Sequence, residues 1–304
     1  MGTPDFAVPS LKALHASDHR VVLVVTQPDR PRGRGRQVFP PPLKTTALSL
    51  GYDVIQPDSL RSEALAADLT GLRPDIIVVI AFGHILPDEI LSLPRLGAIN
   101  VHASLLPKYR GPAPIPWAII NGERETGVTT ILMDAGLDTG AILLTSKTEI
   151  SSEDTAASLH DRLALLSARL LIETLAALEA NDIQPEAQDH SQATYAPLLT
   201  KRDGQIDWGK PAFVLERFVR GMSPWPGAYT FHGVKRLKIF KTKPLALETP
   251  APPGTVIKGF ADELRVATGQ GTLSILEIQG ASGNRLLIKD FLRGYKIPPG
   301  TRLG

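Results

Sequence analysis

An asparagine and a histidine, two residues apart at the end of an apolar run, have a spacing that suggests chemistry. Asn100 and His102 stand in segment 97–107, and a strand there would point both side chains the same way. An amide beside an imidazole could stabilise a developing oxyanion and move a proton. The alternative is that both side chains only satisfy the backbone of a turn at the strand end.

A carboxylate in the loop 133–140 favours the chemical interpretation. Asp138 follows a second apolar run, so it could reach the same crevice and orient the imidazole. Gly136 and Gly140 would let the loop backbone approach a planar ligand closely. The alternative is an ordinary turn built from aspartate and glycine.

Other kinds of site find little support in the sequence. The chain has no cysteine, which excludes disulfides and thiolate nucleophiles. Its seven histidines show no metal-binding spacing, so we expect no metal. Residues 33–35 lack the third glycine of a dinucleotide-binding fingerprint.

The elements that would position these residues are short apolar runs alternating with helical patterns. Runs of this kind predict a doubly wound parallel sheet in a Rossmann-like α/β domain. A long helix is expected from Ser151, where Ser151 and Asp154 fit a capping box, to about Ala180. Buried parallel strands are predicted at 21–25, 47–50, 76–80, 98–101 and 128–133.

A second, smaller domain is predicted after an irregular linker. Pro211 marks a helix start, and residues 224–227 break the chain. The short alternating segments that follow, such as 237–241 and 272–276, predict an OB-like antiparallel β-barrel. We therefore predict a catalytic domain at 1–180, a linker at 181–209 and the second domain at 210–304.

Charge is divided unevenly along the chain. Up to Thr200 there are 16 basic and 23 acidic residues, and after it 17 basic and 8 acidic. This asymmetry favours a polyanionic partner for the second half, although basic residues on a solvated face are the common alternative. A basic run there could track phosphates or merely keep the protein soluble; it contains Lys235, Arg236, Lys238, Lys241 and Lys243.

Four arginines at alternating positions form a cationic arm in the first half. Guanidinium groups packed this densely repel one another unless an anion neutralises them, which favours phosphate contacts over a plain solvated loop. The arm carries Arg30, Arg32, Arg34 and Arg36.

The remaining composition is that of an intracellular protein. Hydrophobic residues make up 43% of the chain, and no apolar run approaches the roughly 18 residues of a membrane span. The N-terminus lacks a signal-peptide pattern. We expect a cytoplasmic monomer with no membrane partner.

The trio of Asn100, His102 and Asp138 resembles the signature of the folate-dependent formyltransferases. Segment 104–107 looks like the folate-associated motif of that family, and segment 82–87 resembles the wall of its pterin pocket. The resemblance covers essentially the whole chain, including segments 2–7, 27–31, 206–208 and 224–226. The folate-binding residues it implies are Phe82, Gly83, Ile85, Leu86, Ser104, Leu105, Leu106, Pro107, Asp134 and Gly136.

The resemblance implies a reaction as well as a fold. A formyl group would pass from 10-formyltetrahydrofolate to the α-amino group of methionine on initiator tRNA, and the arginine arm would enter the acceptor stem, with Arg34 the residue most tied to recognition. One alternative is a sibling enzyme that formylates a sugar-nucleotide amine or a purine precursor, or hydrolyses the donor. Another is a non-catalytic RNA-binding protein.

One departure from the family pattern concerns the start of the chain. The resemblance implies a buried strand directly before Gly2-Thr3-Pro4, where only Met1 stands. We expect a central strand to be absent and the start to lie within a longer coding sequence, because losing such a strand leaves unpaired backbone in the core.

Overall fold

The computed structural model describes residues 1–32, 37–259 and 262–304. The chain divides into two compact units. The first comprises Met1–Pro114, Glu125–Glu149 and His160–Pro197, and the second comprises Ile115–Arg124, Ile150–Leu159 and Leu198–Gly304. The domain boundaries given above remain a prediction.

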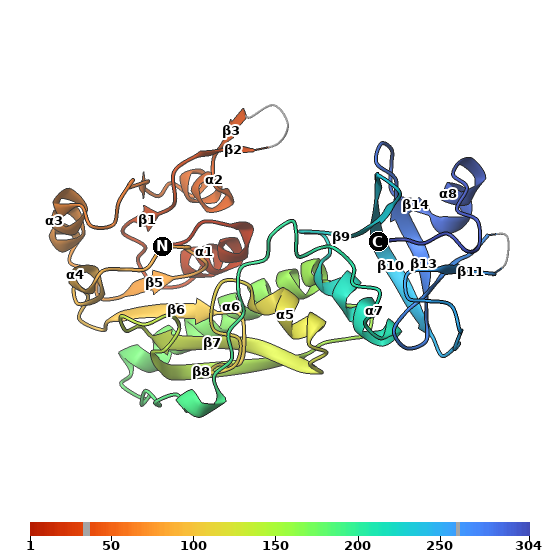
Figure 1. Ribbon diagram of the computed structural model, residues 1–304. Helices are drawn as coiled ribbons and strands as arrows, with labels where there is room; N and C mark the ends of the chain where they lie inside the picture. The colour runs from red at the N-terminus through yellow and green to blue at the C-terminus, as the bar shows by residue number, and fades with distance from the viewer. Residues whose placement is uncertain (33–36, 260–261) are drawn as a thin grey trace. The chain divides into compact units, whose positions relative to one another are not determined.

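The first unit contains the predicted α/β sheet, in two pieces (Figure 1). A parallel pair joins β1 (Val24–Val25) to β4 (Val54–Ile55). A four-stranded sheet follows the order β5 (Ile77–Val79), β6 (Ala98–His102), β7 (Glu125–Leu132) and β8 (Ala141–Glu149). β5 and β6 are parallel, whereas β7 is antiparallel to both of its neighbours.

Two strand predictions need correction. Residues 47–50 are not a strand, because Pro42 opens the helix α2 (Pro42–Ser49) and Val54–Ile55 supplies the strand instead. The strand predicted at 128–133 exists but is not parallel, because the apolar pattern reports burial and not direction. Strands predicted at 21–25 and 76–80 are present only in part.

Helices on both sides bury the sheet of the first unit. α3 (Glu63–Leu72) and α4 (Asp88–Leu91) contribute to a core that includes Val25, Val79 and Ala98. α6 (Ala156–Glu179) packs on β7 through a hydrogen bond of 2.9 Å between the Thr130 and Thr174 hydroxyls. The other helices of this unit are η1 (Asp5–Ala7), α1 (Val8–His15) and η2 (His190–Gln192). α5 (Pro114–Ile120) belongs to the second unit from Ile115 onward.

The long predicted helix is present, but it begins later than expected. The Ser151 amide does donate to the Asp154 carboxylate at 2.8 Å, as a capping box requires. A second reciprocal pair, Thr155 with Ser158, lies at the true helix start. The helix therefore starts at Ala156 and ends at Glu179.

The second unit confirms the predicted small antiparallel β-domain. Its strands follow the order β11 (Val256–Ile257), β12 (Leu264–Ala267), β13 (Thr272–Gln279), β10 (Lys235–Leu245) and β9 (Ala228–His232), with β14 (Leu286–Leu287) also on β13. The Val256 amide donates to Thr301, and the Gly304 amide donates to Phe231, so the C-terminal residues link β11 to β9. Helices α7 (Ala212–Gly221) and α8 (Ile288–Gly294) complete the unit.

Candidate active site

Strand β6 positions Asn100 and His102. It is held on one side by β5 and on the other by β7, where Asn100 lies opposite Ile131 and His102 opposite Thr129. Asn100 is half-buried and His102 is 6% exposed. The two-residue strand period places both side chains against Asp138, as predicted.

Asp138 is the junction of the cluster. Its Oδ1 accepts a hydrogen bond from Asn100 Nδ2 at 3.1 Å and lies 3.6 Å from His102 Nδ1. Its Oδ2 accepts from the Gly111 amide at 2.8 Å. Both carboxylate oxygens are therefore occupied, and the carboxylate is fixed in one orientation.

The hydrogen-bond partner of the other ring nitrogen, His102 Nε2, determines whether that nitrogen carries a proton. His102 Nε2 lies 2.8 Å from the Tyr109 carbonyl oxygen. A carbonyl can only accept a hydrogen bond, so Nε2 must carry a proton. Nδ1, the nitrogen beside Asp138, can then donate only when the ring is doubly protonated.

The Asp138 backbone is held by a residue that sequence reasoning missed. Asp138 has a left-handed φ of 53°, a conformation that few non-glycine residues adopt. The buried Gln188 side chain donates both amide hydrogens, to the Asp138 carbonyl at 2.8 Å and to the Gly140 carbonyl at 2.7 Å. Arg110 donates in turn to Gln188 Oε1 at 2.6 Å.

The segment 104–107 lies directly beside β6. Ser104 and Leu106 are buried, while Leu105 and Pro107 are half-buried. The Thr129 hydroxyl fixes the segment through two hydrogen bonds. It accepts one from the Leu106 amide at 3.1 Å and donates one to the Ser104 carbonyl oxygen at 2.7 Å. Leu105 and Pro107 are thus the members of this motif with surface left for a ligand.

The segment 82–87 presents a mixed surface. Phe82 and Leu86 lie in the apolar core, whereas Ile85 is 74% exposed. Gly83 has a positive φ of 79°, and a Cβ there would lie 2.7 Å from the Gln27 amide nitrogen. The exposed Ile85 is the side chain that could contact a planar ligand.

Asp134 and Gly136 form the turn that leads to Asp138. Asp134 Oδ1 accepts from the Gly136 amide at 3.0 Å and from the Thr139 hydroxyl at 2.6 Å. A Cβ on Gly136 would overlap that hydroxyl. Asp134 therefore shapes the loop through its side-chain carboxylate, as the turn interpretation of this segment predicted.

The arginine arm is described only in part. β2 (Arg30–Arg32) and β3 (Gln37–Phe39) pair as an antiparallel hairpin, in which Arg30 is exposed (Figure 1). Arg32 lies at the end of β2. Arg34 and Arg36 lie outside the described residues.

The basic run of the second unit lies on β10. A bulge between Ile239 and Lys241 shifts the strand register. Lys235, Lys238, Lys241 and Lys243 are exposed. Arg236 lies over the Tyr229 ring at 3.6 Å, and Lys241 pairs with Glu153 at 3.1 Å, so these two cations already have protein partners.

Two searches of the described residues gave negative findings. No group of three or more His, Cys, Asp or Glu side chains in 1–32, 37–259 and 262–304 could hold a metal ion. Over the same residues, no helix is long and apolar enough to cross a membrane.

Comparison with known proteins supplies the family. A model described as formyl transferase matches residues 1–175, and a model of the formyl transferase C-terminal domain matches residues 198–296. A protein of Citrifermentans bemidjiense named methionyl-tRNA formyltransferase is 50% identical over 100% of this chain and 95% of its own length. A protein of the same name from Caldanaerobacter subterraneus is 52% identical over 100% of this chain and 98% of its own.

Solved structures show the same fold at lower identity. An N-formyltransferase from Helicobacter canadensis, in complex with folinic acid and dTDP-3-aminofucose, has a TM-score of 0.69 at 20% identity, covering 90% of this chain and 96% of that one. HypX from Aquifex aeolicus, in complex with tetrahydrofolic acid, has a TM-score of 0.59 at 20% identity, over 89% of this chain and 46% of that one.

Proposed function

The chain belongs to the formyl transferase family, and we propose that the cluster around Asp138 carries its reaction. The enzyme transfers a formyl group from 10-formyltetrahydrofolate to the α-amino group of methionyl-tRNA. Identity near 50% over the full length to relatives of that name separates it from the sugar-amine enzymes, which share only the fold.

The observation that carries the proposal is the convergence of three side chains at the end of β6. Asn100 and Asp138 share a hydrogen bond of 3.1 Å, and His102 meets the same carboxylate oxygen. The α-amino nitrogen attacks the formyl carbon, and the carbonyl oxygen becomes an oxyanion. Asn100 Nδ2 and a doubly protonated His102 are the donors available to stabilise it.

Proton transfer completes the reaction. The attacking amine loses one proton as the carbon–nitrogen bond forms, and N10 of the folate takes one proton as it leaves. His102 Nδ1, which lies 3.6 Å from Asp138 Oδ1, or a water held by Asp138, would move that proton. Because the Tyr109 carbonyl holds Nε2, Nδ1 is the ring nitrogen that can take part.

Arg110 and Gln188 act as positioning residues in this proposal. Together they hold the loop carbonyls on either side of Thr139, and so keep Asp138 in its left-handed conformation. Preorganisation of this kind matters because a displacement of about 1 Å can cost on the order of 100-fold in rate.

The binding residues complete the proposal. Ile85, Leu105 and Pro107 have the surface to contact the folate, with Phe82, Gly83, Leu86, Ser104, Leu106, Asp134 and Gly136 shaping its site. Arg30, Arg32, Arg34 and Arg36, with the basic run on β10, bind tRNA phosphates. We also propose a catalytic domain at 1–180, a linker at 181–209, a tRNA-binding domain at 210–304 and a cytoplasmic monomer.

One assay identifies which molecule accepts the formyl group. Labelled 10-formyltetrahydrofolate is supplied with methionyl-tRNA, free methionine or a sugar-nucleotide amine. We expect label in the tRNA alone. Transfer to the sugar amine would instead support the sibling enzyme, and no transfer to any acceptor would support a non-catalytic RNA-binding protein.

A further inference from the structure

A network of polar side chains lies where the parallel strands β1 and β4 end (Figure 1). Gln56 directly follows β4, and its Nε2 donates to the Gln27 carbonyl oxygen at 2.8 Å and to Asp29 Oδ1 at 2.7 Å. Gln56 Oε1 accepts a hydrogen bond from Lys44 Nζ. The carboxyl ends of parallel strands form the edge at which α/β sheets bind ligands, so the network occupies a place where substrates are expected.

Lys44 and Asp29 form the charged part of this network. Lys44 Nζ lies 2.9 Å from each carboxylate oxygen of Asp29, and the two side chains are 21% and 31% exposed. The hydrogen bond from Lys44 is the main cause that holds the pKa of Asp29 below its ordinary value. Lys44 lies in the first turn of α2, where the positive end of the helix dipole disfavours a cation. Lys44 therefore stabilises the Asp29 carboxylate at a cost to its own helix.

Asp29 is the root of the arginine arm, since it directly precedes Arg30, the first residue of β2. Among the residues that the structure describes, β2 pairs with β3 and with no strand of the main sheet. The direction in which the arm projects therefore depends on how its root is held. Lys44 and Gln56 together donate three hydrogen bonds to the Asp29 carboxylate, and we call these three residues the clamp.

Gln27 joins the clamp to the segment 82–87. Its Nε2 donates to the Phe82 carbonyl oxygen at 2.7 Å, and the Thr3 hydroxyl donates to the same oxygen at 3.2 Å. Its own carbonyl oxygen accepts the hydrogen bond from Gln56. One continuous network thus runs from the root of the arginine arm to the segment that presents the exposed Ile85.

We propose that Lys44 and Gln56 are positioning residues, which hold the arginine arm at a fixed distance from segment 82–87 so that the acceptor end of the tRNA meets the formyl group. The inference rests on the proposed function, in which the arm binds tRNA and segment 82–87 borders the folate. An arm with a loose root would keep its charge but would present the tRNA in many positions. Few of those positions bring the amino group to the formyl carbon, so the rate falls.

Lys44→Met opens the clamp, because it keeps the apolar stem of the side chain and removes the charged donor. We expect kcat/KM for methionyl-tRNA to fall by about tenfold, while the affinity for 10-formyltetrahydrofolate measured without tRNA stays within about twofold. Lys147→Met is the matched control, since it breaks an exposed ion pair with Glu125 at 3.2 Å in β8. Gln27→Met, which also loses the bond to Phe82, should weaken the use of both substrates.

A double-mutant cycle separates positioning of the arm from a general structural role. Lys44→Met is repeated in a chain whose four arm arginines are alanines. If the clamp acts through the arm, Lys44→Met should change kcat/KM for methionyl-tRNA by less than about twofold in that chain. A tenfold loss in both chains would overturn the inference, and so would an unchanged kcat/KM when Lys44→Met is made alone.

The cycle also distinguishes failure of the inference from failure of the proposed function. If the four-alanine chain uses methionyl-tRNA as well as the unaltered chain does, the arm does not bind tRNA, and both fail. If the four-alanine chain is impaired but the cycle is additive, the inference alone fails. Asp29→Asn takes the place of Lys44→Met if that variant does not fold, and an unchanged kcat/KM in Asp29→Asn would also overturn the inference.

Discussion

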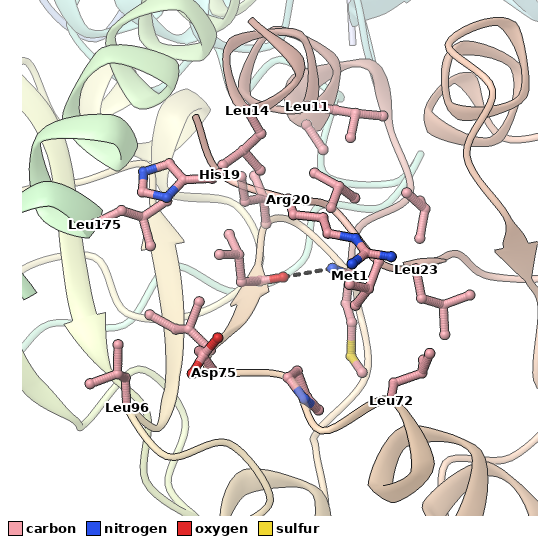
Figure 2. A pocket seen from close by; sticks show the side chains of 18 of the residues that line it. Met1, Leu11, Leu14, His19, Arg20, Leu23, Leu72, Asp75, Leu96 and Leu175 are labelled. Atoms are coloured by element: carbon pink, nitrogen blue, oxygen red, sulfur yellow. Dashed lines mark hydrogen bonds between the residues drawn. The ribbon is translucent and has the colours of Figure 1, made fainter. Parts of the chain in front are cut away.

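The cluster at the end of β6 and the slot beside Met1, a cavity lined by residues 20–24 and by Ile76, Val78 and Ile80 (Figure 2), lie in the same compact unit but satisfy their polar groups differently. In the cluster, both Asp138 oxygens and His102 Nε2 have partners within 3.1 Å. In the slot, a buried amino group has lost its hydration, and burial lowers the pKa of the Met1 amine to about 5.

This difference predicts which property of the protein, turnover or stability, each region affects more. Groups fixed in advance stabilise a transition state without rearranging, so changes in the cluster should reduce turnover more than stability. A desolvated amine weakens the native state, so changes in the slot should alter stability more than turnover.

The largest effect is expected from Asn100→Ala. Removing one oxyanion donor lowers turnover by about 100- to 1000-fold in comparable sites. The thermal midpoint should shift by only a few degrees and tRNA affinity should stay close to normal. Formylation rates, calorimetry and tRNA binding are compared with Asn284→Ala, an exposed asparagine of the second unit. Near-normal turnover in Asn100→Ala would remove Asn100 from the mechanism.

The second effect is a pH dependence of stability from Met1. The amine pKa is 8.0 when unfolded and about 5 when folded. Between these values the unfolded chain binds the extra proton, so the free energy of unfolding rises with pH, and the penalty is complete below about pH 5. From pH 7.5 to 5.5 the loss should be about 2 kcal/mol.

Urea unfolding at the two pH values measures this loss. A chain whose Met1 amine is acetylated serves as the control, because its Met1 nitrogen is an amide that does not titrate. An equal loss in both chains would show that other groups cause it.

A smaller effect is expected from Gln188. Gln188→Glu keeps the acceptor for Arg110 but loses both donors to the 138–140 loop. We expect kcat to fall by about tenfold, with the KM for methionyl-tRNA little changed. Gln192→Ala, an exposed neighbour, is the matched control. A rise in KM with an unchanged kcat would contradict a positioning role.

The smallest effect concerns the arginine arm. Arg34→Ala should reduce the dependence of tRNA binding on salt by about one unit of logarithmic slope, and leave folate binding intact. Lys241→Ala should change the slope less, because Lys241 is already paired with Glu153. The affinity for tRNA is measured between 50 and 200 mM salt. An unchanged slope in Arg34→Ala would argue that the arginine arm does not contact tRNA phosphates.

Local patterns in the sequence predicted the site better than the order of the strands. The two-residue period of a strand is enough to place Asn100 and His102 together, and Asp138 joined them as expected. The same patterns do not report direction, so the antiparallel setting of β7 was missed. Short apolar runs occur in helices as well as in strands, which explains why a strand was wrongly predicted at 47–50.

Long-range contacts were beyond prediction from local patterns. Gln188 lies in the aperiodic stretch 181–209 and acts through two carbonyls 48 and 50 residues away in the chain. No spacing signals such a contact.

If the cluster around Asp138 performs formyl transfer to methionyl-tRNA, the reaction must depend on the Asp138 carboxylate. The initial rate of label transfer from 10-formyltetrahydrofolate to methionyl-tRNA, measured side by side for the unaltered chain and Asp138→Asn, tests it most directly. We predict transfer by the unaltered chain and a rate about 100-fold lower in the variant, whose side chain has nearly the same shape but no charge. Equal rates in the two proteins would show that the Asp138 carboxylate is not required for formyl transfer.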